Sequence, residues 1–205
     1  MALDSYGWFA DVKKWDSYKD IAASDWFQAG VKYVSENNLM SGVSDTGFAP
    51  NTAISHADTV LSLWHLAGEP SACCALPYEN VESDAYRSAI LWAVKMDIIG
   101  EGGSTSFDYD GTVTREEFAL MLYKCAGSPE TKGTLNAFHA KEKVSDSSQK
   151  ALQWAVGKGI ILGKSDRFLD PASMISRAKT ATILERYWIR YNNFRKLKSK
   201  QKKTW

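Results

Sequence analysis

One sequence pattern occurs three times along this chain of 205 residues. Each copy contains a short polar segment that starts with a hydroxyl residue: Ser55, Thr114 and Ser176. The spacings between these starts are 59 and 62 residues, and the same two spacings separate three upstream aromatic residues: Tyr33, Trp92 and Trp154. So many positions in one register indicate tandem units of about 60 residues. We expect the units at residues 1–68, 69–127 and 128–190, followed by a basic tail over residues 191–205.

The sequence of each unit predicts a helix, a polar loop and a second helix. In the first helix, apolar residues recur at helical spacing, as in Ile90, Ala93 and Val94. This helix is expected to stop at a residue type that tolerates the left-handed conformation: Asn38, Asp97 or Gly159. An aromatic residue is expected to plug each loop into the core: Phe48, Phe107 and Phe168, the last shifted by one residue.

The second helix of each unit has a clear start. The three hydroxyl residues that begin the polar segments are typical N-caps. Thr114 and Glu117 form a capping box in the second unit, Asp58 is a shorter substitute in the first, and Lys179 breaks the box in the third. The residue before each cap is apolar and fits a hydrophobic staple: Ile54, Val113 and Ile175.

Composition places the chain among globular proteins. Hydrophobic residues make up 44% of the chain and charged residues 24%. The longest uninterrupted apolar runs have six residues, whereas a membrane-spanning helix needs about 20. The first thirty residues lack both the basic and the apolar region of a signal peptide. Three cysteines, two of them adjacent, predict neither a disulfide framework nor a metal site, and we expect no cofactor.

The charge distribution argues against nucleic acid as the main partner. The net charge is +1, but residues 1–185 carry −7, and residues 186–205 contain eight basic and no acidic residues. Nucleic-acid-binding domains usually present a basic face, whereas the body of this chain is acidic. A helical-repeat module that binds protein or nucleic acid through the basic tail stays open as the alternative function. No motif of a known catalytic site is present, so we do not expect an enzyme.

The repeats resemble the S-layer homology domain family. Three segments carry the likeness: Phe9-Ala10-Asp11-Val12, Gly159-Ile160-Ile161-Leu162-Gly163 and Ile175-Ser176-Arg177-Ala178. The resemblance implies an all-α, pseudo-threefold spindle, in which one helix of each unit joins a central three-helix bundle. It also implies a noncatalytic module of the bacterial cell surface, in the cell wall or S-layer. Its ligand would be a secondary cell-wall polysaccharide, often with pyruvate ketals, bound in grooves between neighbouring units.

The resemblance points to the residue after each second-helix cap as a ligand-binding residue. Arg115 and Arg177 match the family motif, and His56 takes the same place in the first unit. In the first turn of a helix, free backbone N–H groups favour an anion, and a guanidinium can hold a carboxylate with two hydrogen bonds. A neutral imidazole cannot do so, and we therefore expect the His56 groove to be weak or inactive. Replacing either arginine by alanine is expected to weaken binding and to leave the fold intact.

The same resemblance adds Asp11, Gly42 and Gly163 to the candidate binding residues. Asp11 belongs to the family's opening Phe-x-Asp motif, which becomes Tyr78-Glu79-Asn80 and Lys141-Glu142-Lys143 in the later units. Because the first unit has lost the arginine and the third unit the aspartate, at most two good sites are expected.

Structural interpretations of these residues also stay open. The arginines could be exposed first-turn residues with no ligand. The aromatic residues of the first helices are expected in the core rather than on a sugar-binding surface: Tyr33, Trp92 and Trp154. Three further tryptophans suit packing or stacking on a sugar equally well: Trp8, Trp15 and Trp26.

Overall fold

The computed structural model describes residues 15–73, 75–100, 105–163 and 167–192, and in these residues the fold is helical. Its six α-helices are α1 (Gln28–Glu36), α2 (His56–Leu66), α3 (Asp84–Lys95), α4 (Arg115–Cys125), α5 (Asp146–Gly157) and α6 (Arg177–Tyr187). Shorter elements are the 3₁₀ helices η1 (Trp15–Ser17) and η2 (Lys141–Lys143) and the π-helical turn η4 (Trp188–Asn192). Within the described segments β-structure is limited to isolated bridges, so the expected all-α class is confirmed.

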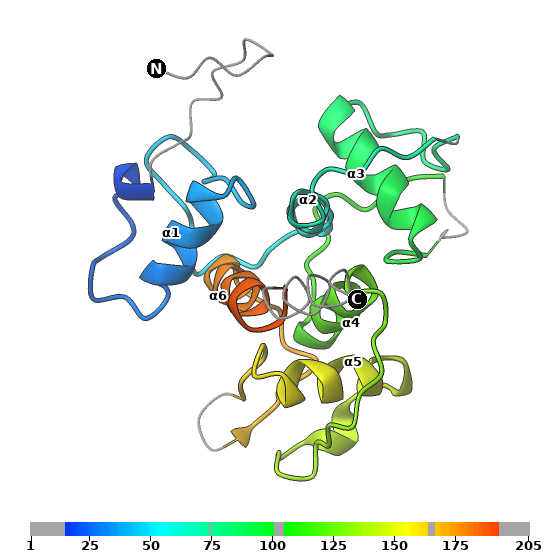
Figure 1. The fold of residues 1–205 in the computed structure, drawn as a ribbon. Coiled ribbons are helices and arrows are strands. Elements are labelled where there is room, and N and C mark those ends of the chain that lie inside the picture. Colours follow the sequence, from blue (N-terminus) through cyan, green and yellow to red (C-terminus); the bar gives the residue numbers. More distant parts are fainter. Residues whose placement is uncertain (1–14, 74, 101–104, 164–166, 193–205) are drawn as a thin grey trace, which may run out of the picture.

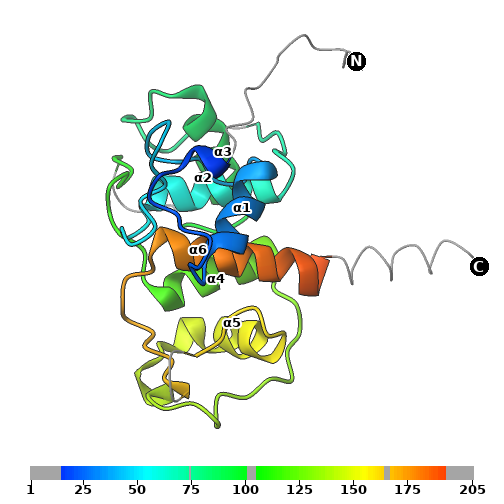
Figure 2. The same ribbon diagram turned by 90° about the vertical axis from the view of Figure 1, so that its left-hand side faces the viewer.

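Three helices form the centre of the molecule and three lie around them. Figure 1 looks roughly along α2, α4 and α6, with α1, α3 and α5 on the outside, and Figure 2 shows the central helices from the side. Each outer helix packs on a central helix: α1 on α6, α3 on α2 and α5 on α4. The outer helix of each predicted unit therefore packs on the central helix of another unit, so no unit buries its own apolar faces alone.

A closed ring of backbone hydrogen bonds ties the starts of the central helices together. The Ile54 N–H donates to the Ile175 carbonyl (3.0 Å), the Ile175 N–H to the Val113 carbonyl (2.9 Å), and the Val113 N–H to the Ile54 carbonyl (3.2 Å). All three side chains are fully buried. The apolar residues expected as staples thus form a three-membered joint in which each unit is bonded to both others.

The predicted caps of the central helices are confirmed. The hydroxyl of Ser55 accepts the Asp58 N–H (3.1 Å), and that of Ser176 accepts the Lys179 N–H (3.4 Å). Thr114 and Glu117 form the reciprocal capping box. A lysine ammonium is only a donor, so Lys179 cannot return a bond to the backbone N–H of its cap.

The predicted ends of the outer helices are also confirmed. Asn38, Asp97 and Gly159 have positive φ values of 53°, 54° and 64°. The residue after each of them donates its N–H back to the last turn of the helix, which closes the helix end. Of the aromatic set expected in the core, Trp92 and Trp154 are buried and Tyr33 is half-buried. In the described segments, no helix combines the length and apolarity needed to cross a membrane.

The prediction that Phe168 plugs the third loop was wrong. Phe48 and Phe107 are buried as expected, but Phe168 is 41% exposed and its neighbour Leu169 is 2% exposed. Leu169 lies 62 residues after Phe107, so the buried position keeps the repeat spacing without a shift. A loop side chain enters the core because of its position on the backbone, and leucine fills that position as well as an aromatic ring.

Candidate functional site

Arg177 fastens the loop of the first unit to the start of α6. Its Nε donates to the Phe48 carbonyl (2.9 Å) and its Nη2 to the Ser41 carbonyl. Its Nη1 pairs with the Asp58 carboxylate (2.8 Å), and the guanidinium lies 4.9 Å from the Phe48 ring centre. The residue is only 4% exposed. All three guanidinium nitrogens are therefore engaged by the protein itself.

Arg115 holds the loop of the third unit in the same way, with one difference. Its Nε donates to the Leu169 carbonyl (3.1 Å) and its Nη2 to the Leu162 carbonyl (3.4 Å), and the residue is 6% exposed. Among the described residues, no carboxylate lies within ion-pair distance of this guanidinium. Asp58 is the third residue after its cap, and the equivalent residue of the third unit is Lys179. The repeat therefore offers Arg115 a lysine where it offers Arg177 an aspartate.

His56 faces two carboxylates. Its Nε2 lies 3.1 Å from Glu117 Oε1 and its Nδ1 lies 3.6 Å from Asp108 Oδ2. Glu117 has the same place in the second unit that Asp58 has in the first, three residues after the cap. In two of the three cases, the residue that follows a central-helix cap contacts the third residue of another central helix: His56 contacts Glu117 and Arg177 contacts Asp58. Arg115 and Lys179, which have the equivalent places, line one groove.

The expectation of free backbone N–H groups at these helix starts was wrong. The N–H groups of His56, Arg115 and Arg177 donate to loop carbonyls of a neighbouring unit at 2.8–2.9 Å. The next residue of each helix does the same, and the third donates to its cap. The loops thus cap the helices, and an anion can be recognised here by side chains only. The interpretation of the arginines as exposed first-turn residues was wrong as well.

Burial lowers the pKa of both arginines, but a charge of opposite sign counteracts it in each case. Asp58 favours the charged form of Arg177 and Asp170 that of Arg115. Arginine stays protonated in proteins, so each groove keeps a cation at its base. In the Arg177 groove the Asp58 carboxylate neutralises that cation at hydrogen-bond distance.

A groove lies beside each of these three residues. The Arg177 groove has a volume of about 320 Å³ and includes Gly42 and Asp58. The His56 groove has about 410 Å³ and includes Asp108 and Glu117. The Arg115 groove has about 250 Å³ and is lined by Trp26, Arg115, Leu162, Gly163, Lys179, Thr182, Ile183 and Arg186. The structure therefore brings Gly42 together with Arg177, and Gly163 together with Arg115.

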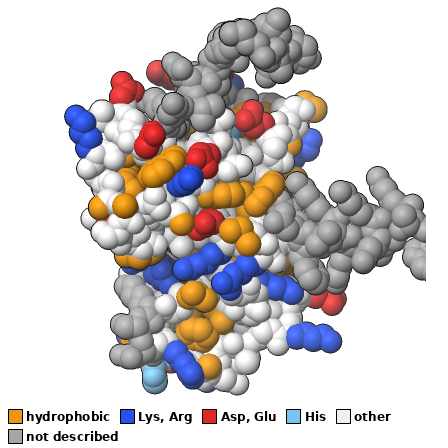
Figure 3. Space-filling view, turned by 60° about the vertical axis from the view of Figure 1, so that its left-hand side comes forward, with side chains coloured by type: hydrophobic (Ala, Val, Ile, Leu, Met, Phe, Trp, Pro, Cys, Tyr) orange, Lys and Arg blue, Asp and Glu red, His pale blue; other side chains and the backbone are white. Residues whose placement is uncertain are grey.

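The Arg115 groove differs from the others in charge. Its described lining contains three cations, Arg115, Lys179 and Arg186, and no acidic residue. Trp26, which is 63% exposed, lies at the same groove. Figure 3 shows Lys and Arg side chains in a band across this face, with hydrophobic side chains on both sides. A groove of this composition suits an anion that is attached to a partly apolar ring.

The two glycines allow the loops to approach the aromatic residues behind them. A Cβ at Gly42 would lie 2.5 Å from the Tyr18 ring, and a Cβ at Gly163 would lie 2.9 Å from the Phe138 ring. The Gly42 N–H also donates to the Tyr18 hydroxyl (2.8 Å). These positions shape the groove walls by close packing.

Asp11 and residues 193–205 of the basic tail lie outside the described residues. Within them, Asp20 supports the first loop, because its carboxylate accepts the N–H groups of Phe48 (2.9 Å) and Ala49 (2.7 Å). Asn80 does the same for Phe107 (2.7 Å). The sequence analysis missed Asp20, although Tyr18 and Asp20 precede Tyr78 and Asn80 by 60 residues each, which was the available signal.

The opening motif assigned to the third unit was also misplaced. Lys141-Glu142-Lys143 forms the short helix η2 instead. Phe138, whose ring lies behind Gly163, and His139 take the place there. The His139 N–H donates to the Arg167 carbonyl (3.0 Å), as the Lys19 N–H does to the Thr46 carbonyl (2.8 Å) in the first unit. The next residue, Ala140, has no side chain that could do what Asp20 does.

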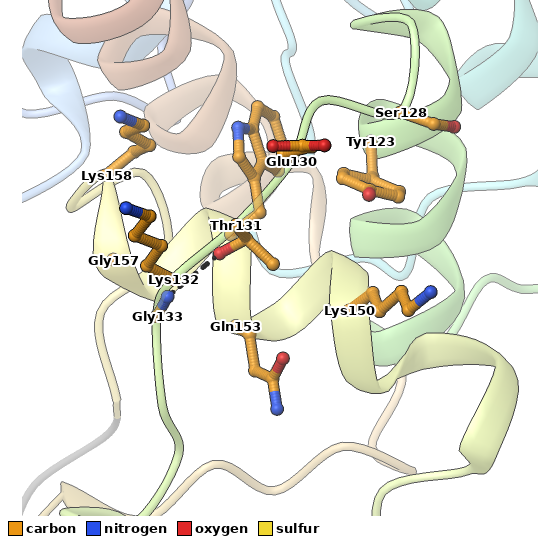
Figure 4. Close-up of a pocket in the computed structure, with 11 residues that line it drawn as sticks. Tyr123, Ser128, Glu130, Thr131, Lys132, Gly133, Lys150, Gln153, Gly157 and Lys158 are labelled. Carbon is orange, nitrogen blue, oxygen red and sulfur yellow. Dashed lines mark hydrogen bonds between the residues drawn. The ribbon is translucent and has the colours of Figure 1, made fainter.

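A larger cavity is separate from these grooves. It has about 910 Å³ and lies between α5 and residues 128–133. Figure 4 shows Glu130 and Thr131 in front of α5, with Lys132 and Lys158 on one side and Lys150 on the other. Its lining includes Trp154 of the repeated aromatic set but none of the candidate ligand-binding residues. We therefore place the candidate site in the inter-unit grooves.

We expect His56 to titrate above its ordinary pKa of 6.5. The hydrogen bond with Glu117 is the main cause, and burial opposes it; the same bond lowers the pKa of Glu117 below 4.5. The protonated His56 therefore stabilises the fold below pH 6.5, and this contribution is lost as the pH rises through the raised pKa. The Glu117 contribution is present above pH 4.5 and is lost as the pH falls through its lowered pKa. An NMR titration of the His56 ring tests this, with Glu117→Gln as the control that returns the pKa toward 6.5; a wild-type value at or below 6.5 would contradict it.

Comparison with known proteins identifies two of the repeats. A family model of the S-layer homology domain matches residues 17–60 and 79–119. The chain is also 21% identical, over 171 residues, to an endoglucanase of Bacillus sp. (strain KSM-635). That similarity covers 82% of this chain but only 18% of the endoglucanase, so the chain spans a small part of that protein's length. The chain therefore carries S-layer homology domains, which anchor proteins to the bacterial cell wall, over residues 17–60 and 79–119.

Proposed function

We propose that this chain attaches to the cell wall by binding an anionic, pyruvylated secondary cell-wall polysaccharide, and that residues 128–190 form a third unit of the same kind. The Arg115 groove, between the second and third units, is the principal site. The observation that carries this assignment is its charge, because its described lining has three cations and no acid. The other two grooves contain protein carboxylates beside their basic residue.

The chemistry of the groove fits a pyruvate ketal. The ketal places a carboxylate on a sugar ring, and a carboxylate forms strong hydrogen bonds with guanidinium and ammonium groups. Arg115 at the base and Lys179 and Arg186 on the wall supply these cations. The exposed indole of Trp26 offers a flat apolar surface to the sugar ring.

A pull-down with purified cell-wall sacculi tests the proposal. Removal of the pyruvate ketals is expected to abolish binding, and Arg186→Gln to weaken it at least tenfold, because a charge-assisted hydrogen bond contributes about 1.5–3 kcal/mol. Lys150→Gln is the matched control, since it removes one cation from the exposed surface of α5 and should bind like wild type. Binding that survives removal of pyruvate would show that the ligand is a different polymer.

A further inference from the structure

Arg115 and Arg177 have equivalent places in their units, and their guanidinium groups make equivalent contacts except at Nη1. Nε donates to the loop-plug carbonyl in both cases, from Arg177 to Phe48 and from Arg115 to Leu169. Nη2 also donates to equivalent carbonyls, those of Ser41 and Leu162, which lie 121 residues apart like the plugs. Nη1 differs, because Arg177 bonds Asp58 there, whereas Arg115 has no such bond among the described residues. Among the described residues, Arg177 thus has a carboxylate at hydrogen-bond distance, whereas Asp170 acts on Arg115 only from beyond that distance.

We propose that the residue three positions after each central-helix cap decides whether the adjacent groove accepts a ligand carboxylate. This inference rests on the proposed polysaccharide binding and adds its selectivity. Asp58 and Glu117 fill their grooves with a carboxylate of the protein, whereas Lys179 leaves Arg115 available. The ligand carboxylate binds Arg115 Nη1 in the position that Asp58 occupies at Arg177, and the Lys179 ammonium acts as its second cation.

The internal carboxylates are held firmly enough to exclude a ligand. Asp58 accepts the Arg177 bond at 2.8 Å and also the Tyr86 hydroxyl at 3.1 Å. Glu117 is bonded to His56 at 3.1 Å and accepts the Thr114 N–H at 3.3 Å. A group tethered in this way is present at a high effective concentration, so a free carboxylate competes poorly with it.

The charges around Arg115 favour binding of a ligand carboxylate. Lys179 replaces a negative residue by a positive one at the groove wall, and Arg186 adds another cation to the same lining. Burial and the nearby Arg190 lower the pKa of Arg186, and Glu185 opposes them. An incoming anion relieves this repulsion, whereas the Arg177 and His56 grooves are already neutralised.

The inference is tested on the full chain by NMR, with acetate as the probe and chloride at equal ionic strength as the reference. The Nε–H resonances of Arg115 and Arg177 report on the two grooves separately. In the wild type, acetate is expected to shift the Arg115 resonance and to leave that of Arg177 unchanged. A methyl hexoside with a pyruvate ketal, compared with the same hexoside without it, is titrated in parallel.

Two reciprocal variants give the decisive comparison. Lys179→Glu is expected to weaken binding at Arg115 at least tenfold, while Lys179→Gln weakens it less. The glutamate would also complete a capping box with Ser176, so the loss of binding would not result from unfolding. Asp58→Asn is expected to create an acetate-dependent shift at Arg177, with the melting temperature as the check that the chain is folded.

The outcomes separate this inference from the proposed function. An Arg115 resonance that acetate does not shift, or a Lys179→Glu variant that binds like wild type, would overturn the inference. Acetate binding at Arg115 without binding of the ketal hexoside or of sacculi would instead overturn the pyruvylated ligand and leave the inference standing. Binding of sacculi with both arginine resonances unchanged would support anchoring and place the ligand elsewhere.

Discussion

Replacing Arg177 by alanine is expected to lower the free energy of unfolding by about 3 kcal/mol, because it leaves buried acceptors without donors. The side chain is 4% exposed, and it donates to two loop carbonyls and to Asp58. The sequence alone had led us to expect that the substitution leaves the fold intact, and these contacts predict a loss of stability instead. Chemical denaturation followed by circular dichroism measures the change, and Lys150→Ala, which removes an exposed cation, should alter stability by less than about 0.5 kcal/mol.

A double-mutant cycle with Asp58→Ala separates the ion pair from the loop contacts. The Asp58 carboxylate is partly exposed, so we expect the pair itself to account for the smaller share of the loss. The two carbonyl bonds would remain in Asp58→Ala and would be lost in Arg177→Ala. Equal effects of the two single substitutions would show that the ion pair, and not the loop clamp, stabilises this joint.

Local features of the fold could be predicted because they depend on residues that are close in sequence. The caps at Ser55, Thr114 and Ser176 follow from a hydroxyl group before an apolar helix. The left-handed residues at the ends of the outer helices follow from their small or amide-like side chains. Because the units share one register, each of these features was predicted in all three units. The structure agrees with all of these predictions.

Contacts between units could not be predicted in the same way. Arg177 and Asp58 are 119 residues apart, and nothing in either segment indicates that α1 packs on α6 rather than on α2. For the same reason, the occupied N–H groups at the central helix starts were missed. The packing of the units shows that Arg115 and Arg177 clamp loops, which the motif did not indicate, and their part in ligand binding stays a prediction.

Matching by residue type instead of by register caused the remaining errors. Phe9-Ala10-Asp11 was selected as the opening motif because it resembles the family consensus, whereas Tyr18 and Asp20 precede Tyr78 and Asn80 by 60 residues, which is within one residue of the repeat spacing. The tyrosine rings of these two motifs pack on Phe48 and Phe107, which confirms the equivalence of the positions. In a diverged repeat, spacing reports the backbone position more reliably than the identity of the side chain.

The third loop plug offers a direct test of that conclusion. Leu169→Ala is expected to lower the free energy of unfolding by about 3 kcal/mol, because it opens a cavity at a fully packed position and keeps the backbone carbonyl that Arg115 uses. Phe168→Ala, one residue earlier, should cost less than about 1 kcal/mol, since that side chain already contacts water. Both variants are compared with wild type by urea denaturation under one set of conditions. If Phe168→Ala were the more damaging of the two, the aromatic side chain and not the register position would define the plug, and the equivalence of Phe48, Phe107 and Leu169 would fail.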